Sequence, residues 1–351
     1  MNQAFQTVIT ASDEERRDLF LGAAARLGTA VQNVEKDFWV CWTLDALFNG
    51  LAPGGPRLLF KGGTSLSKAF GLITRFSEDI DITVFRDDLG HAAEVADLDA
   101  LSGKKRRARL DAIRAACQAY IAGQLMAQLA HLAATGIPGG RYRLELDPDD
   151  KDGQTLLFWY PAVTGSASGY IRSAVKIEAG AKSALDPHVA VPVRPYVADD
   201  VPSLDLTVNN VITVKPERTL WDKIIILHGL RQWHDRRGEL RHGGQRVSRH
   251  YYDVHQLLQA PLAAEWQADH ALAIDCAQHA RLFFGSADLG LDIAHPGTFT
   301  LVPDRAMRDA LRRDYAAMTG MVFGNIPPLD AVLDSIGSFE QLANGPGLAV
   351  R

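Results

Sequence analysis

The chain has 351 residues, of which 47% are hydrophobic and 23% are charged. This balance excludes an intrinsically disordered protein, because disordered chains combine low hydrophobicity with high net charge. The formal net charge of −5 does not indicate a general nucleic-acid binder, since phosphate backbones are held mainly by Lys and Arg, although a local basic patch is compatible with it.

The cysteines Cys41, Cys117 and Cys276 are far apart in the sequence, and no CxxC pair occurs. This spacing indicates neither a zinc ribbon nor a disulfide framework. The N-terminus lacks the basic start and apolar run of a signal peptide, and no apolar stretch is long enough to span a bilayer. We therefore expect a cytoplasmic protein that does not bind a membrane.

The first part of the chain predicts a mixture of helices and strands. Residues 11–28 begin with an acidic, helix-favouring segment and continue with apolar residues at helical spacing, and residues 34–48 repeat this pattern. A strand over 57–61, a helix to about Phe70 capped by Thr64 or Ser65, and a strand over 79–85 follow. The next predicted elements are a long helix over 105–134 and strands at 142–147, 155–160, 173–179 and 191–197.

From Pro216 onward the pattern is mainly helical, with an exposed, Gly-rich loop predicted over 235–247. We place a domain boundary near residue 210, which gives an α/β domain over 1–210 and a helical domain over 211–351. The helices predicted in the second domain cover 216–229, 250–259, 265–282, 304–320 and 328–343.

The segment Ser77–Val84 carries two aspartates separated by one residue on a predicted strand. Strand side chains alternate between faces, so Asp79 and Asp81 point to one side while Ile80 and Ile82 can enter the core. Two adjacent carboxylates repel each other, and Mg²⁺, which prefers oxygen ligands, removes that cost. Taken alone, the pattern also fits a solvated strand end with two acids.

Gly62-Gly63 lies between a predicted strand and a predicted helix, ahead of the aspartate pair. Glycines allow the backbone to approach a ligand closely, and a helix N-terminus offers free N–H groups that suit phosphate. Thr64 and Ser65 add hydroxyl donors. An ordinary tight turn is the alternative, but the order strand, glycines, helix and aspartate strand is far more specific than either motif alone.

This combination resembles the polymerase-β-like nucleotidyltransferase superfamily, whose signature is a GG or GS turn followed by DxD or DxE. Lys61–Leu66 and Arg75–Asp81 more closely resemble the AbiEii-type nucleotidyltransferase toxins of type IV toxin–antitoxin systems. The spacing between the glycines and Asp79 is longer than in many superfamily members, though usual for this branch. Other similar segments extend the resemblance over most of the chain: Val34–Val40, Val175–Glu178, Lys215–Glu217 with Lys223, Arg249–Asp253, Leu301–Pro303 and Asp314-Tyr315 with Met318.

The resemblance implies an α+β fold, in which a polymerase-β-like nucleotidyltransferase core, a small mixed sheet flanked by helices, precedes a C-terminal helical domain. It also implies that Glu178 is a third carboxylate, acting as a metal ligand or general base. The alternative is an edge-strand acid paired with Lys176 or Lys182.

Two further site residues are implied in the helical domain. Lys223 would contact the triphosphate of the nucleotide, whereas the alternative is a lysine that extends from a buried face to solvent. Asp253 would position Lys223 or bind substrate, and an ordinary acid near a helix N-terminus is its alternative. The helical domain would thus complete the nucleotide site and bind the acceptor.

The implied reaction is in-line attack of an acceptor hydroxyl on the α-phosphate of an NTP, with pyrophosphate leaving. One or two Mg²⁺ ions held by Asp79, Asp81 and Glu178 would neutralise charge and activate the nucleophile. Lys61, Gly62, Gly63, Thr64 and Ser65 would bind the phosphates together with Lys223. The implied acceptor is RNA, with a tRNA 3′ end as the leading case, so the reaction would block translation, and the implied protein partner is a cognate antitoxin.

Basic residues gather in two segments, which fit an RNA acceptor, an acidic protein partner or simply a solvated face. Three alternative functions also fit the motifs: nucleotidyl transfer to a protein side chain or a small molecule, phosphotransfer of the γ-phosphate, and a catalytically silent nucleotide-binding module. The basic segments are Lys104–Arg107 with Arg109, and the arginines at 231, 236, 237, 241, 246 and 249.

Overall fold

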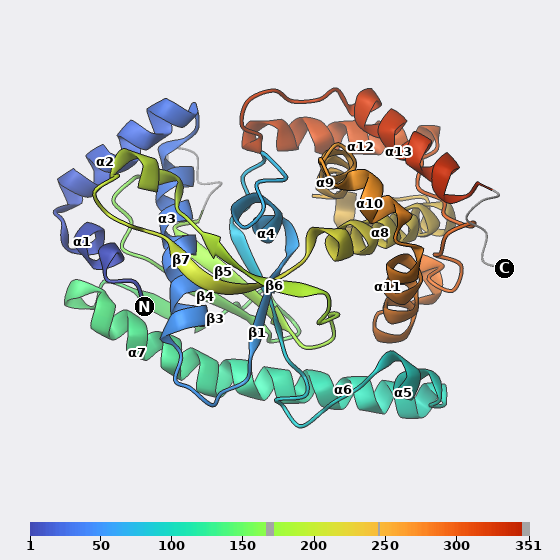
Figure 1. Cartoon of the computed structure of the whole chain (residues 1–351), viewed down its shortest axis with the longest axis horizontal. Coiled ribbons are helices and arrows are strands. Elements are labelled where there is room, and N and C mark those ends of the chain that lie inside the picture. The colour runs from blue at the N-terminus through green and yellow to red at the C-terminus, as the bar shows by residue number, and fades with distance from the viewer. Residues whose placement is uncertain (166–171, 245, 346–351) are drawn as a thin grey trace. The chain divides into compact units, whose positions relative to one another are not determined.

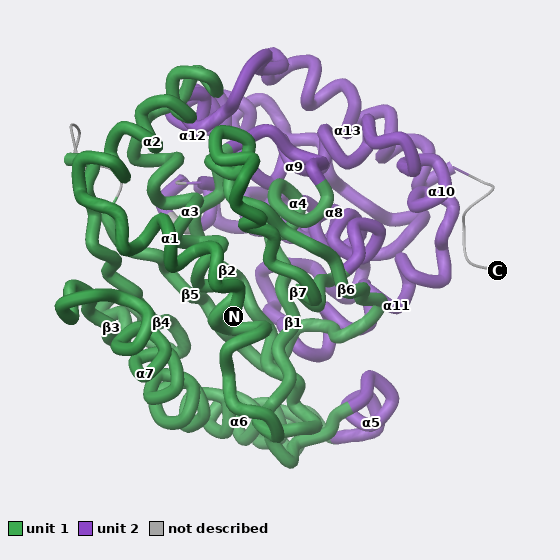
Figure 2. Tube along the Cα trace, turned by 60° about the vertical axis from the view of Figure 1, so that its left-hand side comes forward, with its two compact units in different colours: residues 1–70, 76–93, 102–214 green, residues 71–75, 94–101, 215–351 purple. Residues whose placement is uncertain are grey.

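The computed structural model describes residues 1–165, 172–244 and 246–345, which form two compact units (Figures 1 and 2). Unit 1 takes its residues from 1–70, 76–93 and 102–214, and unit 2 from 71–75, 94–101 and 215–351. Two short segments from the first part of the chain therefore belong to the second unit. Residue 210 lies inside the last strand of unit 1, so this unit continues to Val214.

Unit 1 is built on a seven-stranded sheet with the order β3-β4-β5-β2-β1-β7-β6. β2 runs parallel to β5, and β1 runs parallel to β7, whereas the other neighbouring strands are antiparallel. The sheet is therefore mixed, as predicted. Its strands are β1 (Leu58–Lys61), β2 (Asp79–Val84), β3 (Arg143–Leu146), β4 (Thr155–Trp159), β5 (Ala174–Gly180), β6 (His188–Val193) and β7 (Val208–Val214).

Helices cover this sheet, and α3 contacts β2, β5 and β7. The packing is aromatic: the Trp39 ring stacks on Tyr160 with centroids 5.5 Å apart, and Trp42 stacks on Phe158 at 5.1 Å. The long predicted helix runs through a π-helical turn at Ile121–Leu125 (Figure 1). The helices of unit 1 are α1 (Ala4–Thr10), α2 (Asp13–Leu27), α3 (Val31–Asp45), α4 (Gly62–Lys68), α6 (Gly103–Tyr120) and α7 (Met126–Gly136).

The sequence prediction missed β7, which lies between β1 and β6. Asn209 and Asn210 interrupt its apolar alternation, and Asn residues favour turns. Asn210 in fact adopts a positive φ of 59°, a conformation that Asn tolerates better than most residues. The strand nevertheless forms because Val208, Val211 and Val214 are buried, which outweighs the local turn preference.

Unit 2 is helical, and α8 contacts α9, α10 and α11. Trp221 on α8 is buried, stacks near Phe299 and donates from its indole Nε1 to the Trp266 carbonyl at 3.0 Å. The predicted α+β class with a helical second part is therefore confirmed. The helices of unit 2 are α5 (Val95–Asp99), α8 (Pro216–Arg237), α9 (Ser248–Leu258), α10 (Ala263–Ala268), α11 (His270–Phe283), α12 (Arg305–Met318) and α13 (Leu329–Ala343).

Two predicted boundaries in unit 2 are wrong. Helix α8 continues through the arginines that were assigned to a loop and ends at Gly238, whose φ of 71° makes a left-handed C-cap. The single helix predicted over 265–282 is instead α10 and α11, which separate at Asp269, the N-cap of α11. No helix in the described part of the chain has the length and apolar character needed to cross a membrane.

His228, which is fully buried on α8, is held as a neutral imidazole. The Thr300 N–H donates to Nδ1 at 3.0 Å, so Nδ1 carries no proton and Nε2 donates to the Gly290 carbonyl at 3.2 Å. Burial lowers the pKa of His228 below its ordinary value, against the opposing hydrogen bond to Gly290. Unit 2 is thus built around an uncharged histidine.

We expect this histidine to make unfolding easier in acid. Below about pH 6.5, the ordinary histidine pKa, the unfolded chain binds a proton more readily than the folded chain. The free energy of unfolding therefore decreases as the pH is lowered. The loss from this group should grow as the pH falls from 7.5 to 5. His228→Asn keeps an acceptor at the Nδ1 position but does not titrate. In urea unfolding, the stability difference between the two proteins should shrink at pH 5; a constant difference would contradict the assignment.

Candidate nucleotidyltransfer site

The predicted alternation along β2 is confirmed. Ile80, Ile82 and Val84 are fully buried, whereas Asp79 and Asp81 are partly exposed on the other face. The carboxylate side therefore remains open to a ligand.

The sheet register places both predicted partners next to Asp81. Lys61 at the end of β1 is its antiparallel neighbour, and Glu178 on β5 is its parallel neighbour. β1, β2 and β5 thus bring the glycine turn, the aspartate pair and the third predicted carboxylate to adjacent positions.

Gly62 and Asp81 are in direct contact. Gly62 has a φ of 80°, which only glycine adopts readily, and a Cβ built on it would lie 2.1 Å from Asp81 Oδ2. No side chain fits in that space, so the turn must be glycine for the carboxylate to lie against it. The two motifs that the sequence separates by a long gap form one structural unit.

The hydroxyls that follow the glycines do not cap the helix, which corrects the prediction. Helix α4 begins at Gly62, and Lys61 at its N-cap makes no side-chain capping bond. The fully buried Thr64 hydroxyl donates to the Asp79 carbonyl and lies 2.9 Å from Ser77 Oγ. Ser65, also fully buried, donates to the Gly62 carbonyl at 2.9 Å. Both hydroxyls fix the shape of the turn and its attachment to β2.

Glu178 fits parts of both sequence interpretations. It lies beside Asp81 in register, and its Oε1 is 2.5 Å from Lys176 Nζ. Burial acts to lower the pKa of Lys176, but Glu178 outweighs it and raises that pKa above its ordinary value. The edge-strand part of the alternative is wrong, because β5 lies between β4 and β2. Among the described residues, Asp79, Asp81 and Glu178 do not form a group of three whose ligand oxygens all lie within 4.8 Å of one another.

Two buried ion pairs support this region, and the sequence analysis did not identify them. Lys36 on α3 contacts Glu78, the residue before β2, at 2.7 Å. Lys68 at the end of α4 contacts Asp37 on α3 at 2.6 Å, with both side chains only 3% exposed. The signal was present as consecutive charged residues inside an otherwise apolar helix. Through these pairs, α3 anchors both the start of the aspartate strand and the helix after the glycine turn.

In unit 2, Lys223 and Asp253 form part of a buried three-residue cluster with Arg75. Arg75 Nε and a terminal nitrogen bind the two Asp253 oxygens at 2.7 and 2.8 Å, and Lys223 Nζ lies 2.8 Å from Asp253 Oδ2. The expected proximity of Lys223 and Asp253 is confirmed. Their alternatives are wrong, because Lys223 is buried and paired rather than extended to solvent, and Asp253 is fully buried. Arg75 was not predicted.

The cluster has unusual electrostatics. Burial alone would raise the pKa of Asp253, but the charges and hydrogen bonds of Arg75 and Lys223 hold it well below its ordinary value. Burial lowers the pKa of Lys223; Asp253 opposes this shift and Arg75 reinforces it. One carboxylate therefore faces two buried cations, which leaves positive charge in excess.

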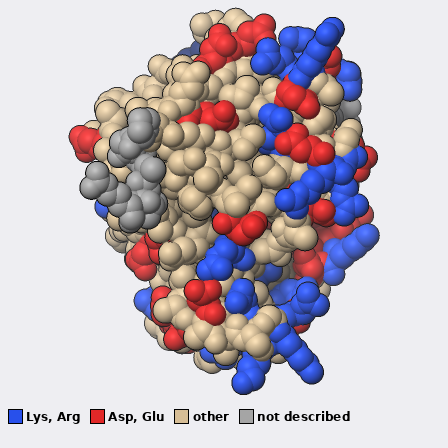
Figure 3. All heavy atoms as spheres, turned by 90° about the vertical axis from the view of Figure 1, so that its right-hand side faces the viewer, with Lys and Arg blue, Asp and Glu red and all other residues tan. Residues whose placement is uncertain are grey.

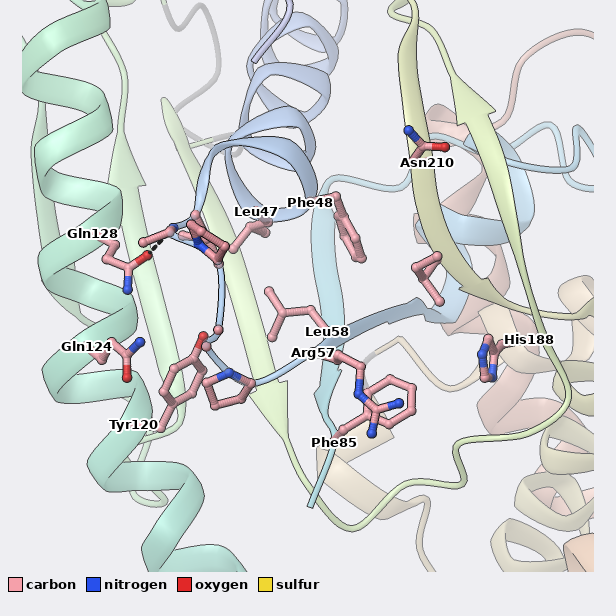
Figure 4. Close-up of a pocket in the computed structure, with 17 residues that line it drawn as sticks. Leu47, Phe48, Arg57, Leu58, Phe85, Tyr120, Gln124, Gln128, His188 and Asn210 are labelled. Carbon is pink, nitrogen blue, oxygen red and sulfur yellow. Dashed lines mark hydrogen bonds between the residues drawn. The ribbon is translucent and has the colours of Figure 1, made fainter. Parts of the chain in front are cut away.

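Unit 1 also contains a cavity of about 340 Å³, which lies away from the aspartate pair (Figure 4). Arg57 and Leu58 line it, and the Arg57 guanidinium lies over the Phe85 ring at 4.3 Å. Leu58 begins β1 and Arg57 precedes it, whereas Lys61 and Asp81 pair at the other end of the strand. The cavity is thus not the aspartate site.

A mixed sheet that holds a glycine turn against one of two aspartates on the neighbouring strand is the arrangement that the sequence motifs led us to expect of a nucleotidyltransferase. Residues 45–335 match the family described as "Nucleotidyl transferase AbiEii toxin, Type IV TA system", and the chain belongs to this family. It is therefore a nucleotidyl-transfer enzyme of a toxin–antitoxin system, as its segments predicted. A solved structure that it resembles is that of MenT4, a nucleotidyltransferase toxin from Mycobacterium tuberculosis H37Rv, with 13% sequence identity and a TM-score of 0.40. The match covers 93% of this chain and 99% of the MenT4 chain. The comparison with curated proteins gave no match.

We expect Gly62→Ala to reduce nucleotidyl transfer by about 100-fold, because displacing a catalytic group by about 1 Å can cost that much. The added Cβ would force Asp81 away, and the positive φ would cost about 1–2 kcal/mol of stability. Gly90→Ala is the matched control, since Gly90 has a φ of 75° but no atom within 4 Å of the added Cβ. Urea unfolding should show destabilisation in both variants, larger in Gly62→Ala because of the added clash, whereas the transfer rate should fall only in Gly62→Ala. Equal activities would refute the contact.

Proposed function

We propose that this enzyme transfers a nucleotide from an NTP to an RNA acceptor, with a tRNA 3′ end as the substrate, and thereby blocks translation in the cytoplasm. The observation that carries the nucleotidyl-transfer part is the Asp81 carboxylate lying against Gly62, with Asp79 on the same strand face. Family membership supports the toxin part, and a cognate antitoxin would be its protein partner.

Asp79 and Asp81 would hold Mg²⁺. The fit is chemical: two carboxylates on one open strand face supply the hard oxygen ligands that this ion prefers, and it would relieve their repulsion. When bound, the ion would neutralise charge on the α-phosphate. Glu178, released from Lys176, would add a third oxygen ligand or accept the proton of the attacking hydroxyl.

The turn Lys61–Ser65 would receive the β- and γ-phosphates. Gly62 and Gly63 allow the backbone N–H groups to come close to phosphate oxygens, while Thr64 and Ser65 keep the turn in shape through their internal bonds. Lys61 would add a positive charge. Lys223, positioned by Asp253, would assist with the triphosphate, and the net positive charge of its cluster suits that role.

The acceptor proposal is supported by arginines on the surface of unit 2. The turn η5 (Arg241–Gly244) contacts both α8 and α12, and exposed arginines lie on both helices and just after the turn. In a chain with a net charge of −5, this local concentration fits a polyanion. Figure 3 shows that Lys and Arg are likewise distributed unevenly, along one edge and the lower end of the face drawn. The exposed arginines are Arg236, Arg237, Arg246, Arg305, Arg312 and Arg313.

The test is to incubate the purified protein with Mg²⁺, total tRNA and, separately, each of the four α-³²P-labelled NTPs. We expect labelled tRNA with at least one NTP, with the label at the 3′ terminus after nuclease mapping. A parallel reaction with γ-³²P label separates nucleotidyl transfer from phosphotransfer. Absence of RNA labelling with every NTP would exclude the RNA acceptor, and transfer of the γ label would exclude nucleotidyl transfer.

A further inference from the structure

A second cluster of metal-ligating side chains lies in unit 2. His234 and Asp235 are on the last turns of α8, and Asp304 is the N-cap of α12. One ligand atom from each lies within 4.8 Å of the other two, and this is the only such group of three or more found in residues 1–165, 172–244 and 246–345. His234 is buried, whereas both aspartates are exposed.

The histidine nitrogen that faces the acids has no hydrogen-bond partner among the described residues. His234 Nδ1 is buried, and it lies 3.9 Å from Asp304 Oδ1, too far for a hydrogen bond. The residue is only 7% exposed, so an unsatisfied ring nitrogen there carries a desolvation cost. A ligand between the two side chains would remove that cost.

The two carboxylates are held loosely enough to close on such a ligand. Asp235 Oδ1 accepts from Arg231 Nε at 2.7 Å, and Asp304 Oδ1 accepts from the Met307 N–H at 2.8 Å. Metal–ligand bonds of about 2.0–2.2 Å in a tetrahedron place two ligands of one ion about 3.3–3.6 Å apart. The ligand atoms, now within 4.8 Å of one another, reach that geometry by side-chain movements of about 1 Å, which the two exposed aspartates can make.

From this arrangement we propose that His234, Asp235 and Asp304 bind a divalent transition-metal ion of the Zn²⁺ class. An imidazole nitrogen with two carboxylates favours Zn²⁺ or Co²⁺ over Mg²⁺ or Ca²⁺, which prefer oxygen ligands alone. The two aspartates supply negative charge that attracts a cation, although Asp235 shares its charge with Arg231. The bound ion would join the end of α8 to the start of α12, the two helices that contact the arginine-bearing turn η5.

The test uses metal-free full-length protein in which Asp79→Asn and Asp81→Asn remove the carboxylates of β2 as competing ligands. Titration with Co²⁺, followed by its visible absorption, and with Zn²⁺ by calorimetry should give one saturable site. Asp304→Asn should weaken Zn²⁺ binding at least tenfold and, because Asn is an equally good N-cap, leave the fold intact. His234→Ala should abolish the Co²⁺ spectrum.

His270→Ala is the matched control, since His270 lies on α11 of the same unit, outside the cluster. It should bind Zn²⁺ as the parent does. Zn²⁺ should also raise the thermal midpoint of the parent but not of Asp304→Asn. Equal Zn²⁺ affinity in the parent, Asp304→Asn and His234→Ala, or saturation by Mg²⁺ at the same concentration, would overturn the proposal.

Discussion

Asp81→Asn is expected to lower the rate of nucleotidyl transfer by about 10³-fold or more, because a metal-binding carboxylate contributes several kcal/mol of transition-state charge stabilisation. The amide has the same shape as the carboxylate and can still lie against Gly62. It loses the negative charge that would hold Mg²⁺. Without the ion, the charge on the α-phosphate would not be neutralised. The initial rate of α-³²P incorporation, measured over a range of NTP and Mg²⁺ concentrations, gives the effect directly.

The same variant should not be less stable than the parent by more than about 1 kcal/mol, since it removes repulsion between Asp79 and Asp81. Asp87→Asn is its control, because Asp87 is exposed just beyond β2 and lies outside the site; its rate should stay within about twofold of the parent. If Asp81→Asn retained more than a tenth of the rate, or lost activity only by unfolding, Asp81 would not be a catalytic ligand.

Asp253→Ala should produce the largest loss of stability, about 3–5 kcal/mol in the free energy of unfolding. The substitution leaves Arg75 and Lys223 buried side by side with no carboxylate between them. Burial already lowers the pKa of Lys223, and losing Asp253, the group that opposes this shift, should lower that pKa further. Urea unfolding of the full chain, followed by tryptophan fluorescence, measures the loss.

The matched control is Asp288→Ala, which removes an acid paired with Arg237 at 2.6 Å at a partly exposed position in the same unit. Exposed pairs contribute only about 0–1 kcal/mol, so this variant should remain near the parent. Arg75→Met together with Asp253→Leu removes a charge of each sign and should recover part of the loss. Similar stabilities for Asp253→Ala and Asp288→Ala would show that the cluster does not hold unit 2 together.

These expected results assign different roles to the aspartate strand of unit 1 and to the buried cluster of unit 2. The aspartate strand is suited to binding charge: its carboxylates are partly exposed, and glycine is required where Asp81 lies against the turn. The Arg75–Asp253–Lys223 cluster is built for position, because its carboxylate accepts hydrogen bonds on both oxygens and is fully buried. Substitution should therefore affect mainly rate in the first and mainly stability in the second.

The amino-acid sequence alone determined the class of enzyme and the local elements that carry its chemistry. Alternation along β2 fixes which side Asp79 and Asp81 face, and Gly62-Gly63 between a strand and a helix marks the turn. Both are short-range properties, set by backbone geometry over a few residues, so they could be predicted without the fold. The end of α8 was predicted wrongly, because a charged, exposed segment fits a helix as well as a loop.

Only the tertiary structure decided which distant residues meet. Arg75 binds Asp253 across 178 positions, and Lys36 binds Glu78 across 42; neither pair follows from local spacing, because each depends on how helices pack in the folded chain. The sheet order likewise put Glu178 on an internal strand beside Asp81. Thr64, predicted to cap a helix, instead donates a hydrogen bond to the Asp79 carbonyl. The sequence thus specified the chemical groups of the site, and long-range packing specified their partners.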